Sequence, residues 1–79
     1  MRLFVGNLPY QVSRKELIEL FGVYGRAHVE IPLHPRTGLA MGFAIVRYYN
    51  RKEGRRALRE LNGLLLAGRL IRVVRNRSR

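Results

Sequence analysis

Hydrophobic positions along the chain follow two different spacings, one typical of strands and the other typical of helices. Short stretches of alternating polarity occupy residues 2–6, 27–31, 41–48 and 69–74, and this period of two predicts four β-strands. Between them, apolar residues recur three and four positions apart, which predicts two helices. Their predicted buried positions are Leu17, Leu20, Phe21 and Tyr24 in the first helix and Gly54, Ala57, Leu58 and Leu61 in the second.

Capping signals mark the ends of both predicted helices. Ser13 and Glu16 have the spacing of a capping box, in which the hydroxyl accepts from a backbone N–H and the carboxylate reaches back. Asn50 is expected to cap the second helix. Gly25 and Gly63 are expected to end the two helices, because glycine adopts the conformation that closes a helix without strain.

The predicted elements follow the order β-α-β-β-α-β, with a short turn or ribbon at residues 64–68 before the last strand. This order is that of the ferredoxin-like fold. Its two right-handed crossovers place both helices on one face of a four-stranded antiparallel sheet and leave the other face uncovered. We therefore expect one α+β domain over residues 1–75 and a basic tail at residues 76–79.

Alternation within the strands predicts which side chains occupy the uncovered face. In the first strand Leu3 and Val5 are expected to face the helices, so that Phe4 faces outward. The same reasoning adds a set of residues from the other strands: His28, Glu30, Met41, Phe43, Ile45, Arg47, Leu70, Arg72 and Val74. An uncovered apolar patch with a cationic fringe indicates a binding surface, and stacked bases with their phosphates would satisfy it.

Charge adds to this expectation. The 79 residues include 16 Lys+Arg and 5 Asp+Glu, which gives a net charge of +11. Most of the cations are arginine, whose planar guanidinium stacks and contacts phosphates bidentately, so the excess favours a nucleic-acid partner. Several cations crowd the exposed side of the second helix, either as a solvated face or as an additional phosphate-contacting or partner surface: Arg51, Lys52, Arg55, Arg56 and Arg59.

Residues needed for catalysis or metal binding are scarce in the sequence. Cysteine is absent, which excludes disulfides and thiolate metal sites and is compatible with a cytoplasmic location. His28 and His34 are the only histidines, and neither has a cysteine or aspartate near it, so we expect no metal. No phosphate-binding glycine loop or catalytic triad is present, and no apolar run approaches the ~18 residues of a membrane span. We therefore expect a protein that is not an enzyme, has no cofactor and has no membrane partner.

Two stretches resemble the paired motifs of the RNA recognition motif (RRM) family. LFVGNL (3–8) has an aromatic second residue and ends in Asn-Leu, as does the family's first-strand hexamer. MGFAIVRY (41–48) resembles the family's third-strand octamer, with matches at Gly42, Phe43, Ala44, Val46 and Tyr48. ELFGVYG, ALRELNG and GRLIRV resemble the first helix, second helix and last strand of the family. The resemblance covers nearly the whole chain and implies the strand order 4-1-3-2. The chain is most similar to the small stand-alone RRM proteins of bacteria.

The resemblance also implies roles for individual residues. Phe4 would stack on a base, Phe43 would pack against riboses, and Arg72 and Arg75 would contact bases and phosphates. The implied RNA-binding set is Phe4, Asn7, Met41, Phe43, Ile45, Arg47, Arg72 and Arg75. Tyr10 is expected to pack over the loop after the first strand.

The chain departs from the octamer at two positions. Met41 replaces the usual Lys or Arg, and Ile45 replaces a stacking aromatic. Because a base stacked on an aromatic contributes ~1–3 kcal/mol, we expect modest affinity and loose specificity for single-stranded RNA, with single-stranded DNA as a weaker partner. Two alternatives stay open: a protein partner or homodimer joined through the aliphatic sheet face, and a nonspecific polyanion binder or RNA chaperone that acts through its arginines.

Overall fold

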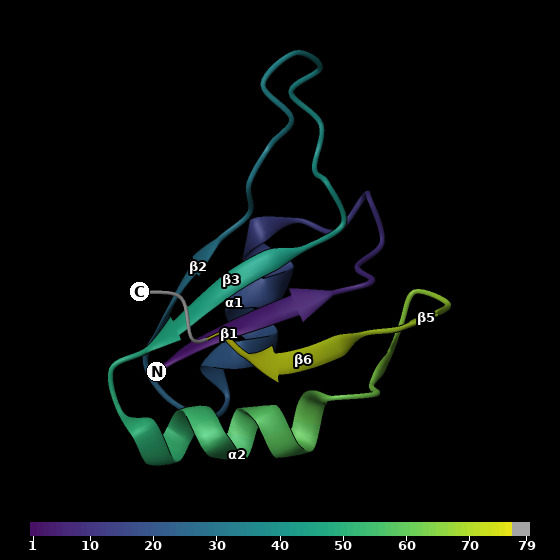
Figure 1. The fold of residues 1–79 in the computed structure, drawn as a ribbon. Coiled ribbons are helices and arrows are strands. Elements are labelled where there is room, and N and C mark those ends of the chain that lie inside the picture. The colour runs from purple at the N-terminus through teal and green to yellow at the C-terminus, as the bar shows by residue number, and fades with distance from the viewer. Residues whose placement is uncertain (77–79) are drawn as a thin grey trace.

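Four antiparallel strands form the main sheet, in the spatial order β2-β3-β1-β6 (Figure 1). The computed structural model describes residues 1–76, and residues 77–79 of the predicted tail lie outside the described residues. The main strands are β1 (Arg2–Gly6), β2 (Ala27–Glu30), β3 (Ala44–Tyr48) and β6 (Arg72–Arg75). The helices are α1 (Arg14–Gly22) and α2 (Arg51–Leu61), and a small ribbon consists of β4 (Leu65–Leu66) and β5 (Arg69–Leu70). This is the expected α+β fold, with the expected strand order.

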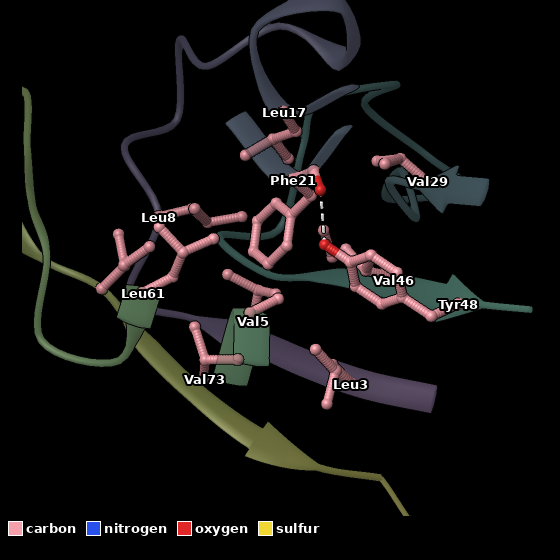
Figure 2. Close-up of a cluster of buried hydrophobic side chains, with 13 residues drawn as sticks. Leu3, Val5, Leu8, Leu17, Phe21, Val29, Val46, Tyr48, Leu61 and Val73 are labelled. Atoms are coloured by element: carbon pink, nitrogen blue, oxygen red, sulfur yellow. Dashed lines mark hydrogen bonds between the residues drawn. The ribbon is translucent and has the colours of Figure 1, made fainter. Parts of the chain in front are cut away.

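The core lies between the sheet and the two helices, which cover the same face. Leu17 and Phe21 of α1 and Leu61 of α2 meet inward-facing side chains of the strands (Figure 2). The buried strand positions are those that the alternation predicts: Leu3, Val5, Val29, Ala44, Val46, Tyr48, Ile71 and Val73. Because every second residue points inward, the residues between them occupy the uncovered face.

Tyr48 carries a polar group into this core. Its hydroxyl donates a hydrogen bond to the backbone carbonyl of Phe21, at the end of α1 (Figure 2). Burial raises the pKa of the Tyr48 hydroxyl well above its usual range, and the nearby Tyr24 and Glu53 raise it further. The hydrogen bond therefore fixes the last turn of α1 to β3.

Both helix starts form as the sequence predicts. Ser13 Oγ accepts from Glu16 N at 3.1 Å, and Glu16 Oε1 accepts from Ser13 N at 2.9 Å, which completes the capping box. Asn50 Oδ1 accepts from the backbone N–H groups of Lys52 and Glu53 at 2.9 and 3.2 Å. These bonds satisfy donors that have no partner within the first turn of a helix.

The first helix ends earlier than predicted, at Gly22 instead of near Gly25. Tyr24 N donates to the carbonyl of Phe21 at 3.2 Å, and Gly25 N donates to the carbonyl of Gly22 at 3.3 Å. Such bonds between residues three apart tighten the chain and close the helix. Gly25 itself has a φ of +149° and lies directly against the Glu53 carboxylate, where a Cβ would be 2.0 Å from Oε1.

Three predicted strands are also shorter than their hydrophobic pattern. The strand predicted over 27–31 ends one residue early, at Glu30. The prediction for 41–48 was wrong at its start, because Gly42 has a φ of +82° and leaves the extended conformation. The prediction for 69–74 divides into β5 and β6 at Ile71. Ile71 N donates to the Leu64 carbonyl at 2.9 Å, and the Ile71 carbonyl accepts from Gly63 N at 2.8 Å. Its backbone is thus paired with the turn that follows α2.

Candidate nucleic-acid interface

Two stacked phenylalanines occupy the centre of the uncovered sheet face. The ring centroids of Phe4, in β1, and Phe43, just before β3, are 5.3 Å apart, and the ring planes differ by 24°. This geometry is an offset stack. Both rings are half-buried, so each keeps part of its surface for a ligand.

Gly6 makes room for the Phe4 ring. A Cβ at Gly6 would lie 2.9 Å from Cε1 of Phe4, closer than side-chain atoms normally approach. The ring therefore covers the backbone at the end of β1, and Gly6 is buried beneath it.

Aliphatic side chains surround this aromatic pair. Phe4 lies opposite Ile45 of β3 and Val74 of β6 in the strand register, and both partners are half-buried. Met41, before β3, is 41% exposed. Leu70, predicted on this face, belongs to the β4–β5 ribbon instead of the main sheet and is 61% exposed. Ile45 thus places an aliphatic side chain, in place of the family's aromatic, directly beside Phe4, at the distance where cross-strand side chains contact each other.

A cationic group occupies the end of the face where β1 begins. Arg47 lies opposite Arg2 of β1 and His28 of β2. Residues paired across a sheet point to the same side, so Arg2 and His28 join Arg47 on the uncovered face. Sequence reasoning missed Arg2, although the alternation that places Phe4 outward also places Arg2 outward.

An arginine–tyrosine pair extends this cationic group beyond the ends of β2 and β3. The guanidinium of Arg26 lies over the ring of Tyr49, 5.1 Å from its centroid, and Tyr49 is exposed. The sequence reasoning also missed this pair. Continuing the alternation by one residue beyond the strands would have found it.

The predicted arginines of the last strand point to different sides. Arg72 lies opposite Gly6, which is on the side of the Phe4 ring, and it is exposed. Arg75 lies opposite Leu3, whose side chain is buried against the helices. The Cβ of Arg75 is therefore on the helix-covered side, and the structure does not bring Arg75 together with the other predicted site residues.

The side chain of Asn7 is hydrogen-bonded within the protein. Its Nδ2 donates to the Leu70 carbonyl at 2.9 Å, and its Oδ1 accepts from Nη2 and Nε of Arg69 at 2.7 and 3.2 Å. Its φ is +57°, a conformation that asparagine adopts more readily than most residues. The carboxamide of Asn7 thus ties the end of β1 to β5.

Neither histidine belongs to a cluster of metal ligands. His34 Nδ1 accepts from the backbone N–H groups of Arg36 and Thr37 at 3.2 and 3.4 Å, which stabilises a turn. Within residues 1–76, no group of three or more His, Cys, Asp or Glu side chains could hold a metal ion. No helix in the same part of the chain is long and apolar enough to cross a membrane.

This site and fold agree with the comparisons with known proteins. The model of the family described as "RNA recognition motif" matches residues 3–72. The chain belongs to this RRM family.

Its curated relatives are longer, eukaryotic proteins. The chain is 36% identical over 72 residues to the Saccharomyces cerevisiae "Nuclear localization sequence-binding protein", covering 90% of this chain and 17% of that protein. It is 40% identical over 72 residues to the human "Serine/arginine-rich splicing factor 8", covering 90% of this chain and 26% of that protein. These relatives do not support the expected likeness to small stand-alone bacterial proteins.

Two solved structures show the same fold. The crystal structure of "RNA Binding Protein PG1" has a TM-score of 0.94 at 31% identity and covers 100% of this chain and 96% of that chain. The RNA complex of the Sex-lethal protein has a TM-score of 0.93 at 28% identity and covers 98% of this chain and 47% of that chain.

Proposed function

We propose that this protein binds single-stranded RNA across the uncovered face of its main sheet. The stacked pair of Phe4 and Phe43, with Arg47 and Arg72 on the same face, carries this proposal. Aromatic rings provide stacking platforms for unpaired bases, while arginines neutralise the phosphates. Membership in the RRM family and the similarity to a Sex-lethal RNA complex support the proposal.

The proposed complex divides its contacts between stacking and charge. Phe4 stacks on a base, Phe43 packs against riboses, and Met41 and Ile45 add apolar contact. The cations Arg47 and Arg72 meet phosphates, with Arg2 beside Arg47. One stacking aromatic fewer, at ~1–3 kcal/mol, lowers the affinity by roughly 5- to 100-fold.

Titration of labelled single-stranded RNA at several salt concentrations tests this function. For single strands, the logarithm of the association constant falls with the logarithm of salt concentration by about 0.7 per phosphate contact. Phe4→Ala is expected to weaken binding about tenfold and Ile45→Ala less, because an aliphatic side chain lacks π overlap. No binding at low salt by the folded protein would refute the proposal. A larger loss for Ile45→Ala than for Phe4→Ala would refute the assignment of roles.

The domain formed by residues 1–75 acts in this proposal as a binding module without catalytic activity. It works without a cofactor, prefers RNA to single-stranded DNA and acts in the cytoplasm. The absence of cysteine supports the location. A competition titration with DNA of the same sequence tests the preference, because only RNA offers 2′-hydroxyl groups for recognition.

A second candidate function is association with a protein, including a second copy of this chain, through the same sheet face. The exposure of the large aliphatic side chain Met41 and of Leu70 in the adjoining β4–β5 ribbon favours it. Light scattering during size exclusion distinguishes the two functions. A dimer that dissociates when Leu70 is replaced by Lys would support the second, and a monomer at all concentrations would count against self-association.

A further inference from the structure

A pocket of about 330 Å³ adjoins the sheet face. It lies between the loop that follows β1 and the long β2–β3 loop, which projects beyond the sheet (Figure 1). Its lining residues are Tyr10, His34, Thr37, Leu39, Ala40 and Met41. Tyr10 and Leu39 are each 68% exposed, so Tyr10 does not pack over its own loop as the sequence reasoning expects. The volume is at the lower end of the ~300–1,000 Å³ typical of ligand sites, which suits a single planar ring system.

Backbone hydrogen bonds fix both walls of this pocket. Gly42 turns the chain after Met41, and its carbonyl accepts from Leu8 N at 2.9 Å. This bond joins the loop after β1 to the start of β3, and the Tyr10 ring lies 3.6 Å from where a Cβ of Gly42 would be. In the opposite wall, His34 N donates to the Leu39 carbonyl at 2.8 Å and pairs the two arms of the β2–β3 loop. The walls are therefore already formed without a ligand.

A few polar groups interrupt the apolar lining. Because His34 Nδ1 accepts two backbone hydrogen bonds, the ring proton of the neutral imidazole is on Nε2, which can donate. Thr37 Oγ1 accepts from Leu39 N at 3.3 Å and keeps its own hydrogen for donation. Tyr10 contributes a phenolic hydroxyl at the end of an aromatic plane. An apolar slot with a small number of hydrogen-bonding groups is the usual chemistry of a site for a planar heterocycle.

The pocket is continuous with the sheet face. Met41 forms part of its wall, and only Gly42 separates Met41 from Phe43 along the chain. The ring of Phe43 stacks on Phe4, so an RNA strand that crosses these two rings reaches the mouth of the pocket. Residues 31–43 include Arg36 and no acidic residue, and this charge suits a polyanion better than an acidic peptide.

We propose that this pocket takes one unpaired base of the RNA strand that crosses the sheet, with Tyr10 as its stacking platform. The inference rests on the proposed RNA-binding function and extends it by one base site. Tyr10 then supplies, at the edge of the face, an aromatic contact of the type that Ile45 lacks at its centre.

RNAs of two lengths distinguish binding in the pocket from binding on the sheet. A single-stranded tetranucleotide is long enough to cover the sheet, on which an RRM stacks two or three bases, while an octanucleotide is long enough to reach the pocket as well. Tyr10→Ala is expected to weaken binding of the octanucleotide about tenfold and to leave tetranucleotide binding unchanged. Tyr10→Phe retains the ring and is expected to retain the affinity. Because Tyr10 is exposed, neither change should alter folding.

Further variants serve as controls. Leu39→Ala is expected to weaken only octanucleotide binding. Val23→Ala changes an exposed aliphatic side chain at the end of α1 and is expected to leave the affinity for both RNAs unchanged. Phe4→Ala is expected to weaken both lengths. Equal octanucleotide affinities for Tyr10→Ala and the unmodified protein would overturn the pocket proposal and leave the sheet proposal intact. Equal losses at both lengths would also overturn it, because Tyr10 would then act on the sheet, and failure of both RNAs to bind would overturn both proposals.

Discussion

Replacing Ile45 by phenylalanine should increase the affinity for single-stranded RNA. Ile45 lies directly opposite Phe4 in the register and is half-buried on the proposed binding face. Directly opposed cross-strand side chains have Cβ atoms about 4.5–5.5 Å apart, so Ile45→Phe would set a second ring beside Phe4 without entering the core. A base stacked on that ring contributes ~1–3 kcal/mol. A stacking free energy in the middle of this range exceeds the ~1.4 kcal/mol that corresponds to tenfold in affinity. We therefore expect Ile45→Phe to bind RNA at least about tenfold more tightly.

Fluorescence anisotropy with one labelled RNA measures this gain, and Met41→Lys is the matched comparison at the other position that departs from the octamer. Ile45→Phe changes no charge and should leave the salt dependence of binding unchanged. Met41→Lys adds a cation and should steepen the salt dependence by up to about 0.7. Thermal unfolding shows whether each variant is folded. If folded Ile45→Phe binds no tighter than the unmodified protein, bases do not stack at this part of the sheet and the reasoning fails.

Three further changes test the fold that supports the face. Tyr48→Phe removes the hydroxyl that donates to the Phe21 carbonyl and should lower the free energy of unfolding by about 1 kcal/mol in urea denaturation. Because folding raises the pKa of Tyr48, the protonated hydroxyl contributes its full stabilisation below the unfolded pKa of ~10, and this contribution is lost as the pH rises toward the folded pKa. Tyr48→Phe lacks this group and should therefore lose less stability above pH ~10 than the unmodified protein. Equal losses in the two proteins would contradict the assignment. Arg55→Glu replaces two like-charge pairs on α2, with Arg51 and Arg59 four residues away on either side, by opposite-charge pairs. It should raise the free energy of unfolding by about 1 kcal/mol. An unchanged melting temperature would mean that these arginines do not repel one another. Gly6→Ala places a Cβ against the Phe4 ring and should weaken RNA binding without lowering stability, and unchanged affinity in the same anisotropy assay would show that the position of the ring does not matter.

The order of elements and the side of each strand residue could be predicted because both depend on local periodicity. Leu3 and Val5 are buried and Phe4 is outward, as an alternation of two requires. Ser13 and Glu16 form their capping box because both partners lie within one turn of the chain. Physical constraints that act over a few residues are visible in the sequence.

The errors came from long-range contacts and backbone angles. Asn7 matches a family motif, but its carboxamide is bonded to residues about sixty positions away. Arg75 faces the side opposite to Arg72. The alternation that places Val74 outward already predicts this side for Arg75, and only the family resemblance placed Arg75 in the binding set. The start of β3 depends on the positive φ of Gly42, which the apolar pattern of 41–48 conceals.

Most of the charge on the face lies away from the pocket, although Arg72 lies opposite Gly6 at the end where β1 finishes. Arg2, His28 and Arg47 occupy the end where β1 begins, whereas Met41 and the pocket adjoin the end where β1 finishes. The four residue steps from Arg2 to Gly6 separate these ends by ~13 Å, beyond the distance at which mutational effects usually couple. Removing Arg2 or Arg47 should therefore change the salt dependence of binding, and truncating the uncharged pocket residues Tyr10 and Leu39 should change the dependence of binding on RNA length. Phe4 and Phe43 lie between the two ends. One RNA strand can therefore contact both the cationic end and the pocket only by crossing the stacked rings.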